Sequence, residues 1–294
     1  MWNGAQDTLA LDWCCDVDPD NTICPSEPEP PTVGYTLHFD GVDDLVYVFD
    51  QEPPMRPENY GDFDFSTHFT IEAWIKPSTL FLGGNYAAVA QGVTAGAGGA
   101  YTFGLQNSPP GTWFLSVCVP SCNSATSPGD NLDAMRWQHV AGVYDGSSIT
   151  IYRNGQEIAA ESWSGDVSDV IGLVIGRWQV GSPVAFPGLV EDLRVWNTAR
   201  SQFEILSTMY GGVSGFEPDL MGYWRFNEGS GQYANDSSVR GNHGQLGESP
   251  LVDAADPTWV VYDPPLVFAP SRLFVQRWDP YEPMFDCADE IKPP

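Results

Sequence analysis

Apolar and polar residues alternate with a period of two along much of the chain, a pattern that predicts β-strands with one buried face. The clearest case is the segment 69–75, Phe-Thr-Ile-Glu-Ala-Trp-Ile, in which residues 69, 71, 73 and 75 face one way. Alternation also marks residues 35–48, on both sides of a turn at Asp40-Gly41. Further strands are expected at residues 101–105, 112–119, 137–144, 148–153, 173–176, 188–196 and 220–226.

Turn signals separate these segments, and one helix is expected among them. Asn154-Gly155 is the strongest turn signal, because a two-residue hairpin needs positive φ at both central positions. Residues 201–209 predict a short helix, in which Ser201 caps the first turn and Glu204 completes a capping box. Many short strands and a single helix are typical of an all-β sandwich or barrel.

Composition supports this fold class and indicates one domain between two arms. The chain has 30 glycines and 25 prolines, as expected for strands joined by tight turns. We find a single core and predict a β-sandwich domain over residues 35–262. An extended acidic, Cys/Pro-rich arm over residues 1–34 precedes it, and an extended Pro/aromatic-rich arm over residues 263–294 follows it. The second arm is apolar enough to pack against its own sandwich or a neighbouring one.

The charge balance restricts the partners. With 39 acidic against 12 basic residues, the net charge of -27 disfavours nucleic acid and anionic membranes. No apolar run approaches the roughly 20 residues that span a bilayer, so membrane insertion is not expected. The first 30 residues lack the basic start and apolar middle of a signal peptide, so an extracellular or cell-surface location has to be inferred by other means.

Six cysteines favour disulfides and an oxidising compartment. Cys118 and Cys122 flank a short loop and are expected to pair with each other. Cys14 and Cys15 would then reach Cys24 and Cys287 and tie the chain ends together. A zinc site is the alternative, but the spacing matches no familiar zinc pattern.

A series of motifs in order resembles the laminin-G-like jelly-roll family of the concanavalin A-like lectin/glucanase superfamily. The segment 37–46, Leu-His-Phe-Asp-Gly-Val-Asp-Asp-Leu-Val, begins the series. It continues through residues 69–76, 137–146, 151–155, 174–176, 188–201 and 222–231. The resemblance implies two antiparallel sheets packed face to face, with the first and last strands adjacent, and it agrees with the cysteines in favouring an extracellular protein.

The same resemblance implies a calcium site near the first strand and the strand that carries an acidic pair. The matching positions are Asp40, Gly41, Asp43, Asp44, Glu191 and Asp192. Calcium takes about six to eight oxygen ligands, so carboxylates beside a glycine turn suit it. Glu191 shares strand parity with residues 193 and 195 and is expected to point inward, where a metal or an arginine must answer its charge. The alternative is that the aspartates only bond their own turn backbone.

A second polar cluster falls in a Gly-rich segment. It comprises Asn227, Glu228, Asp236, Ser237, Asn242 and His243, and we favour a loop held by side-chain to backbone hydrogen bonds. Asn235-Asp-Ser237 is an N-glycosylation sequon, so Asn235 is a candidate glycosylation site in a host that glycosylates.

Two functions from different classes fit this chain. The first is a structural subunit that self-assembles with copies of itself through its two arms into a filament, sheath or surface layer, stabilised by calcium. The second is a carbohydrate-binding or adhesion module, in which loop aromatics stack on glycans. The candidate aromatics are Tyr60, Tyr86, Trp163 and Trp178, although such residues more often pack on the core or its rim. The arms favour assembly slightly.

Glycoside hydrolysis is the third and weakest hypothesis. It needs two carboxylates about 5 to 10 Å apart across a cleft, which jelly-roll hydrolases supply from one strand in a Glu-x-Asp-x-Glu alternation. No such alternation occurs: Glu191 and Asp192 are adjacent, and Glu217-Pro-Asp219 has no further acid after it. We therefore expect a non-enzymatic protein with no catalytic residues.

Overall fold

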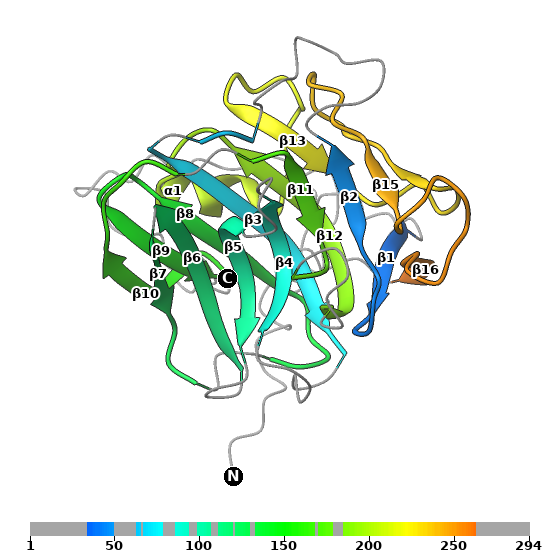
Figure 1. Ribbon diagram of the computed structural model, residues 1–294, viewed down its shortest axis with the longest axis horizontal. Coiled ribbons are helices and arrows are strands. Elements are labelled where there is room, and N and C mark those ends of the chain that lie inside the picture. The colour runs from blue at the N-terminus through cyan, green and yellow to red at the C-terminus, as the bar shows by residue number, and fades with distance from the viewer. Residues whose placement is uncertain are drawn as a thin grey trace, which may run out of the picture. The chain divides into compact units, whose positions relative to one another are not determined.

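The alternating segments form two antiparallel sheets that make a β-sandwich of the jelly-roll kind (Figure 1). In the described part of the chain each sheet has eight strands. Sheet A has the order β10 (Gln156–Ser162), β9 (Ser148–Arg153), β8 (Gln138–Tyr144), β3 (Phe69–Pro77), β12 (Pro187–Trp196), β1 (Gly34–Asp40), β16 (Thr258–Tyr262), and β13 (Leu220–Trp224) also pairs with β12. Sheet B has the order β14 (Tyr233–Ala234), β15 (Gly244–Leu246), β2 (Val46–Phe49), β11 (Gly172–Ile175), β4 (Tyr86–Val93), β5 (Gly99–Gln106), β6 (Thr112–Val119), β7 (Ser121–Thr126).

The computed structural model describes part of the chain. The described residues are 34–49, 63–65, 67–78, 86–93, 99–106, 111–119, 121–129, 133–167, 170–178 and 185–262. They all belong to one compact unit, Pro28–Val267. Apart from Gly34, the two predicted arms lie outside these residues, together with Cys14, Cys15, Cys24 and Cys287 and the disulfides expected of them.

Apolar side chains from both sheets fill the space between them. Phe39, Ile71 and Val195 of sheet A meet Val48 and Phe103 of sheet B in one continuous cluster of buried residues. Strand alternation delivers these residues to one face, because their chain neighbours point to the other side of each sheet. The core therefore lies where the period-two pattern predicts it.

The sequence predictions for individual elements are largely confirmed. The first strand, β1, pairs with the last, β16, as the resemblance implied. Asn154 and Gly155 both have positive φ, 49° and 73°, which is the geometry of the predicted hairpin turn between β9 and β10. The predicted helix is α1, Gln202–Thr208, with Ser201 and Glu204 forming the capping box.

Helix α1 covers part of the outer face of sheet A. Its one buried residue, Ile205, packs against Ala141 and Val143 of β8. No helix within the described residues combines the length and the apolar character that crossing a membrane requires.

Candidate functional site

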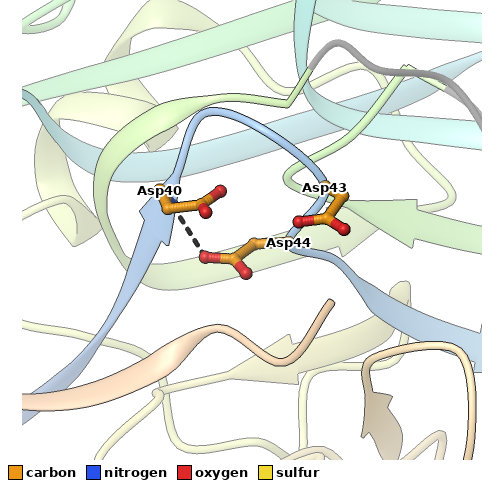
Figure 2. Close-up of side chains that lie close together, drawn as sticks. All are labelled: Asp40, Asp43 and Asp44. Carbon is orange, nitrogen blue, oxygen red and sulfur yellow. Dashed lines mark hydrogen bonds between the residues drawn. The ribbon is translucent and has the colours of Figure 1, made fainter. Parts of the chain in front are cut away.

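Three of the predicted metal-binding aspartates lie together at the turn between β1 and β2 (Figure 2). The ligand oxygens of Asp40, Asp43 and Asp44 are all within 4.8 Å of one another. Gly41 makes the turn possible, since its φ of +84° is in the left-handed region that favours glycine. We call Asp40, Asp43 and Asp44 the aspartate corner.

Hydrogen bonds inside the turn use only some of these oxygens. The Val42 N–H donates to Asp40 Oδ1 at 2.7 Å, and the Asp40 N–H donates to Asp44 Oδ2 at 2.7 Å. The backbone bonds of the alternative interpretation are therefore present. Among the described residues, no hydrogen bond engages the second oxygens of Asp40 and Asp44 or either oxygen of Asp43.

The electrostatics of the aspartate corner are unfavourable without a cation. Asp44 is only 4% exposed. Burial, together with the charges of Asp40, Asp43 and Asp256, raises its pKa to about 7 against the lowering effect of the hydrogen bond from the Asp40 N–H. Among the described residues no cationic side chain forms an ion pair with the three carboxylates. The guanidinium of Arg177 bonds the Asp43 backbone carbonyl and Glu248 instead.

The donor set of the corner fits calcium. All of its side-chain ligands are carboxylate oxygens, which hard divalent cations prefer over nitrogen or sulfur ligands. The charge of Asp256, on the loop before β16, acts on Asp44, and the Leu45 N–H donates to the Ala255 carbonyl of the same loop at 3.1 Å. Four carboxylate oxygens are fewer than calcium takes, so backbone carbonyls or water would have to complete its shell.

Glu191 and Asp192 do not join the aspartate corner. Asp40 pairs with Pro187, whereas Leu37 pairs with Val190, so the acidic pair lies further along β12. The carboxylate of Asp192 accepts hydrogen bonds from the Tyr223 hydroxyl at 2.8 Å and from Arg194 at 3.3 Å.

The predicted inward orientation of Glu191 is wrong, and a β-bulge is the reason. Glu191 pairs with Trp74 and Arg194 pairs with Glu72, so β12 carries one residue more than β3 between these pairs. Asp192, with φ of 50°, is the inserted residue. Val190 and Leu193 both reach the core, and Glu191 shares the outer face with Trp74. Strand parity therefore does not hold across the bulge.

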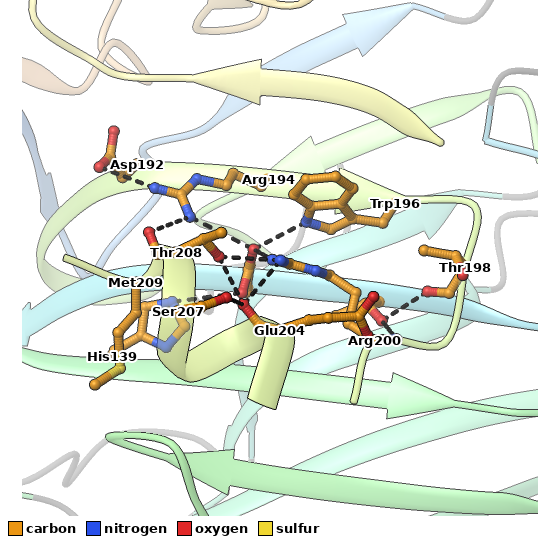
Figure 3. A network of polar contacts seen from close by, with 12 residues as sticks. His139, Asp192, Arg194, Trp196, Thr198, Arg200, Glu204, Ser207, Thr208 and Met209 are labelled. Carbon is orange, nitrogen blue, oxygen red and sulfur yellow. Dashed lines mark hydrogen bonds and ion pairs between the residues drawn. The ribbon is translucent and has the colours of Figure 1, made fainter. Parts of the chain in front are cut away.

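A second charged cluster lies buried between sheet A and helix α1 (Figure 3). Its centre is Glu72, which is fully buried. Arg200, Arg194 and His139 surround its carboxylate, and Trp196 Nε1 donates to it at 2.9 Å. Burial alone would raise the pKa of Glu72, but these charges and the indole N–H hold it below its usual value.

The same arginines bind the backbone of α1, Arg194 at its C-terminal end and Arg200 in its first turn. Arg194 donates to the Thr208 carbonyl at 3.2 Å, and Arg200 donates to the Glu204 carbonyl at 2.9 Å. Figure 3 shows both guanidinium groups beside the helix end. At Thr208 the carbonyl without an intrahelical partner and the negative end of the helix dipole both favour the Arg194 cation. Because the cluster is closed to solvent, its role is to hold the helix on the sheet.

The second predicted polar cluster is also structural, as favoured. Asp236 accepts hydrogen bonds from the N–H groups of Tyr223, Ser238 and Asn242, and the Asn242 side chain donates to the Met221 carbonyl at 2.8 Å. Glu228 and His243 each accept one backbone N–H of the same loop. Asn235, the candidate glycosylation residue, is exposed at the end of β14. Whether it is glycosylated stays a prediction.

The aromatic residues predicted to meet sugars have other surroundings. Trp163 packs against the core, and Trp178 contacts Phe114 with their ring centroids 6.0 Å apart. Tyr60 and the side chain of Tyr86 lie outside the described residues. The disulfide between Cys118 and Cys122 is present, across the hairpin of β6 and β7.

Sheet B has a property that the sequence reasoning missed. None of its eight strands contains Asp, Glu, Lys or Arg, although 17% of the residues of the chain are charged. The charged residues of the described strands all lie in sheet A: Asp40, Glu72, Lys76, Arg153, Glu157, Glu161, Glu191, Asp192 and Arg194. The strand residues on the outer face of sheet B therefore carry only amide, hydroxyl, apolar and aromatic groups. The disulfide lies at one edge of the sheet.

Three aromatic side chains and one amide gather on this outer face at strands β14, β15 and β2. Tyr233 pairs with Gln245, and Gln245 pairs with Tyr47. Their chain neighbours Ala234, Leu246, Val46 and Val48 are core residues, so these side chains point outward. Phe49 contacts Tyr47 edge to face, with ring centroids 4.1 Å apart. We call Tyr47, Phe49, Tyr233 and Gln245 the aromatic platform.

Solvent reaches the aromatic platform. Tyr233 is 45% exposed and Phe49 is 37% exposed, while Tyr47 and Gln245 are half-buried. β2 and β15 lie side by side in the sheet although they are far apart in the sequence (Figure 1), and β14 pairs with the other side of β15. Such rings present apolar faces, and the amide and phenol groups beside them can donate and accept hydrogen bonds. That combination suits a ligand with both apolar and hydroxyl surfaces.

Three solved structures resemble this chain to different degrees. A candidate carbohydrate-binding protein from Bacteroides ovatus is 20% identical, with a TM-score of 0.57 over 79% of this chain and 60% of that chain. A pentraxin from Limulus polyphemus is 16% identical, with a TM-score of 0.44 over 78% of this chain and 92% of its own. A sialidase carbohydrate-binding module from Ruminococcus gnavus, bound to α2,3-sialyllactose, is 16% identical with a TM-score of 0.47 over 60% and 96%.

The family comparison is more direct. No curated protein sequence matches the chain. The chain spans 60% of the length of the Bacteroides ovatus protein, and at this identity the likeness shows the fold alone. The laminin-G-type family model described as the concanavalin A-like lectin/glucanases superfamily matches residues 54–206, which is more than half of the chain. On these grounds and on its two-sheet architecture, the chain belongs to the concanavalin A-like lectin/glucanase superfamily.

Proposed function

We propose that this chain is a non-enzymatic, extracellular carbohydrate-binding module that binds glycans on the aromatic platform. One observation carries the proposal: the strands of sheet B have no charged residue in a chain of net charge -27, and their outer face carries solvent-reached aromatic rings and an amide. Sugar rings have apolar C–H faces and hydroxyl edges, so aromatic faces and amides are their natural partners. The disulfide of β6 and β7 supports an extracellular setting.

A glycan array tests this function with a matched pair of double variants. Phe49→Ala with Tyr233→Ala removes two exposed rings of the platform. Phe203→Ala with Phe216→Ala removes two rings that are 78% and 77% exposed on helix α1 and on the loop after it. We expect the wild type and the second variant to retain the same glycans and the first variant to lose them. An array on which the wild type retains no glycan would refute carbohydrate binding.

We also propose calcium at the aspartate corner, as a stabilising ion. Its support is the oxygen-only donor set and the raised pKa of Asp44, which a bound cation would reverse. Calcium at a hundredfold excess over its dissociation constant would add about 2.7 kcal/mol to the free energy of unfolding, because it binds only the folded state. The melting temperature should then rise by roughly 5–10 °C.

Thermal melts with calcium and with EDTA test this ion. Asp43→Asn is the informative variant, because the Asp43 side chain makes no hydrogen bond within the described residues. Asp219→Asn, at an exposed aspartate, is its control. We expect the calcium shift to persist in Asp219→Asn and to shrink in Asp43→Asn. Equal shifts in both variants would place the ion elsewhere, and no shift in the wild type would remove it.

Self-assembly through the arms finds no support in the comparisons, which favour the carbohydrate-binding alternative. The arms lie outside the described residues, so this hypothesis stays a prediction. Light scattering of the full chain before and after deletion of residues 1–33 and 263–294 tests it. An unchanged particle size would remove its main support.

A further inference from the structure

We infer that the aromatic platform selects short, electrically neutral sugar motifs and rejects acidic ones. The inference rests on the proposed function, since it names the ligand class of the same site. The absence of charged groups on the strands that carry the site determines which ligand charge it accepts. The burial of the neighbouring strands independently limits the length of the ligand.

An acidic sugar needs a charged partner in its binding site. A carboxylate or sulfate that leaves water must gain a charge-assisted hydrogen bond, most often from an arginine or lysine. The strands of the platform offer none: β2 is Val-Tyr-Val-Phe, β15 is Gly-Gln-Leu and β14 is Tyr-Ala. The field of the whole chain also opposes an anion, because its net charge is -27. A neutral sugar needs no charged partner and is not repelled by the net charge of the chain.

The aromatic platform is one end of a row of side chains that runs across the strands of sheet B. From Tyr233, Gln245 and Tyr47 the row continues through Val174 to Gln91, in register. Val174 and Gln91 are both fully buried, so the row is closed to solvent at β11. The open part spans three strands, which is about 10 Å across the sheet, and two residues along β2, which is about 7 Å. A patch of that size holds about two sugar rings.

Neutral and acidic forms of one glycan test the charge selectivity, and oligomers of increasing length test the size of the site. Titration calorimetry on the full chain, in buffer with calcium, would compare lactose with α2,3-sialyllactose, and each neutral glycan retained on the array with its sialylated, sulfated or uronic-acid form. We expect the acidic form to bind at least about tenfold more weakly than the neutral form. A series of lengthening oligomers of one retained sugar should gain affinity up to about two rings and then level off.

The outcomes distinguish this inference from the proposed function. Acidic forms that bind as tightly as neutral ones would overturn the selectivity while leaving a carbohydrate-binding module. Affinity that keeps rising with oligomer length would overturn the short footprint. Equal binding by the wild type and by Phe49→Ala with Tyr233→Ala would move the site off the platform. No binding of any glycan by the wild type would refute the proposed function itself.

Discussion

Replacing Glu72 by glutamine should be among the most destabilising conservative substitutions in this protein. Glu72 is the one acid at the centre of the buried cluster beneath α1, with Arg194 and Arg200 both directed at its carboxylate. Glutamine has nearly the same shape and keeps an acceptor for Trp196 Nε1, so the change removes the charge and little else. Two guanidinium groups, 1% and 6% exposed, would then lie in the interior without their shared counter-charge.

The magnitude follows from that burial. Removing one partner of a buried ion pair costs about 3–5 kcal/mol, because the remaining charge is uncompensated. Arg194 keeps a weaker partner in Asp192, and both arginines keep the helix carbonyls, which places the expected loss at about 3 kcal/mol. For a domain of this size that corresponds to a melting temperature lower by roughly 6–12 °C.

Urea denaturation followed by intrinsic tryptophan fluorescence measures this free energy without screening the charges. Glu161→Gln is the matched control, because Glu161 is an exposed acid on the edge strand β10 and should change stability by less than about 0.5 kcal/mol. Equal stability of Glu72→Gln and the control would mean that the buried charges do not depend on each other. A midpoint shift with an altered m-value would instead point to a change in the denatured state.

Two further predictions concern a buried histidine and a glycine. Burial lowers the pKa of His139 to about 4, against the attraction of Glu72, so the unfolded chain takes up this proton near pH 6.5 before the folded protein can. The free energy of unfolding should therefore fall between pH 6.5 and 4 by up to about 3 kcal/mol. His139→Gln should lose this pH dependence, and His68→Gln, the exposed control, should keep it. The same pH dependence in the wild type and in His139→Gln would show that His139 does not titrate. At Gly176, with φ of +85°, an added Cβ would lie 2.2 Å from the Phe39 ring, whereas at Gly231, with φ of +95°, it would meet nothing within 4 Å. Urea melts should show Gly176→Ala less stable than Gly231→Ala by about 1–3 kcal/mol, and equal losses would show that the ring moves aside freely.

Most strands that send alternate residues into the core could be predicted from the sequence, although β4 was missed with Val89 and Ala90 in the core. Segments such as β3 and β6 alternate because the core selects every second residue. In contrast β10, Gln-Glu-Ile-Ala-Ala-Glu-Ser, lies at the edge of sheet A and is exposed along nearly its whole length. β7, Ser-Cys-Asn-Ser-Ala-Thr, is the edge of sheet B and has one fully buried residue, Ala125. An edge strand with few buried residues leaves no clear period in the sequence.

The candidate sites were predictable to the extent that their residues are close in sequence. The aspartate corner lies within five residues of one turn, so its members were identified together. Glu191 was misplaced because one inserted residue, Asp192, reverses the parity of a strand without any local signal beyond an uncommon positive φ. The aromatic platform was missed because Tyr47 and Tyr233 become neighbours only through the pairing of β2, β15 and β14.

The distribution of charge between the two sheets follows from what covers each outer face. A charged side chain on a sheet face needs a partner once that face is covered. On sheet A the helix α1 provides partners, since its Thr208 and Glu204 carbonyls accept hydrogen bonds from Arg194 and Arg200 while Glu72 balances the two charges. The strands of sheet B carry no charged side chain that would need such a partner. An acidic protein that must meet a neutral ligand needs one surface from which fixed charge is absent, because every fixed charge would hold water that the ligand has to displace. If the aromatic platform binds glycans as proposed, a sugar would displace water there that no fixed charge of these strands holds.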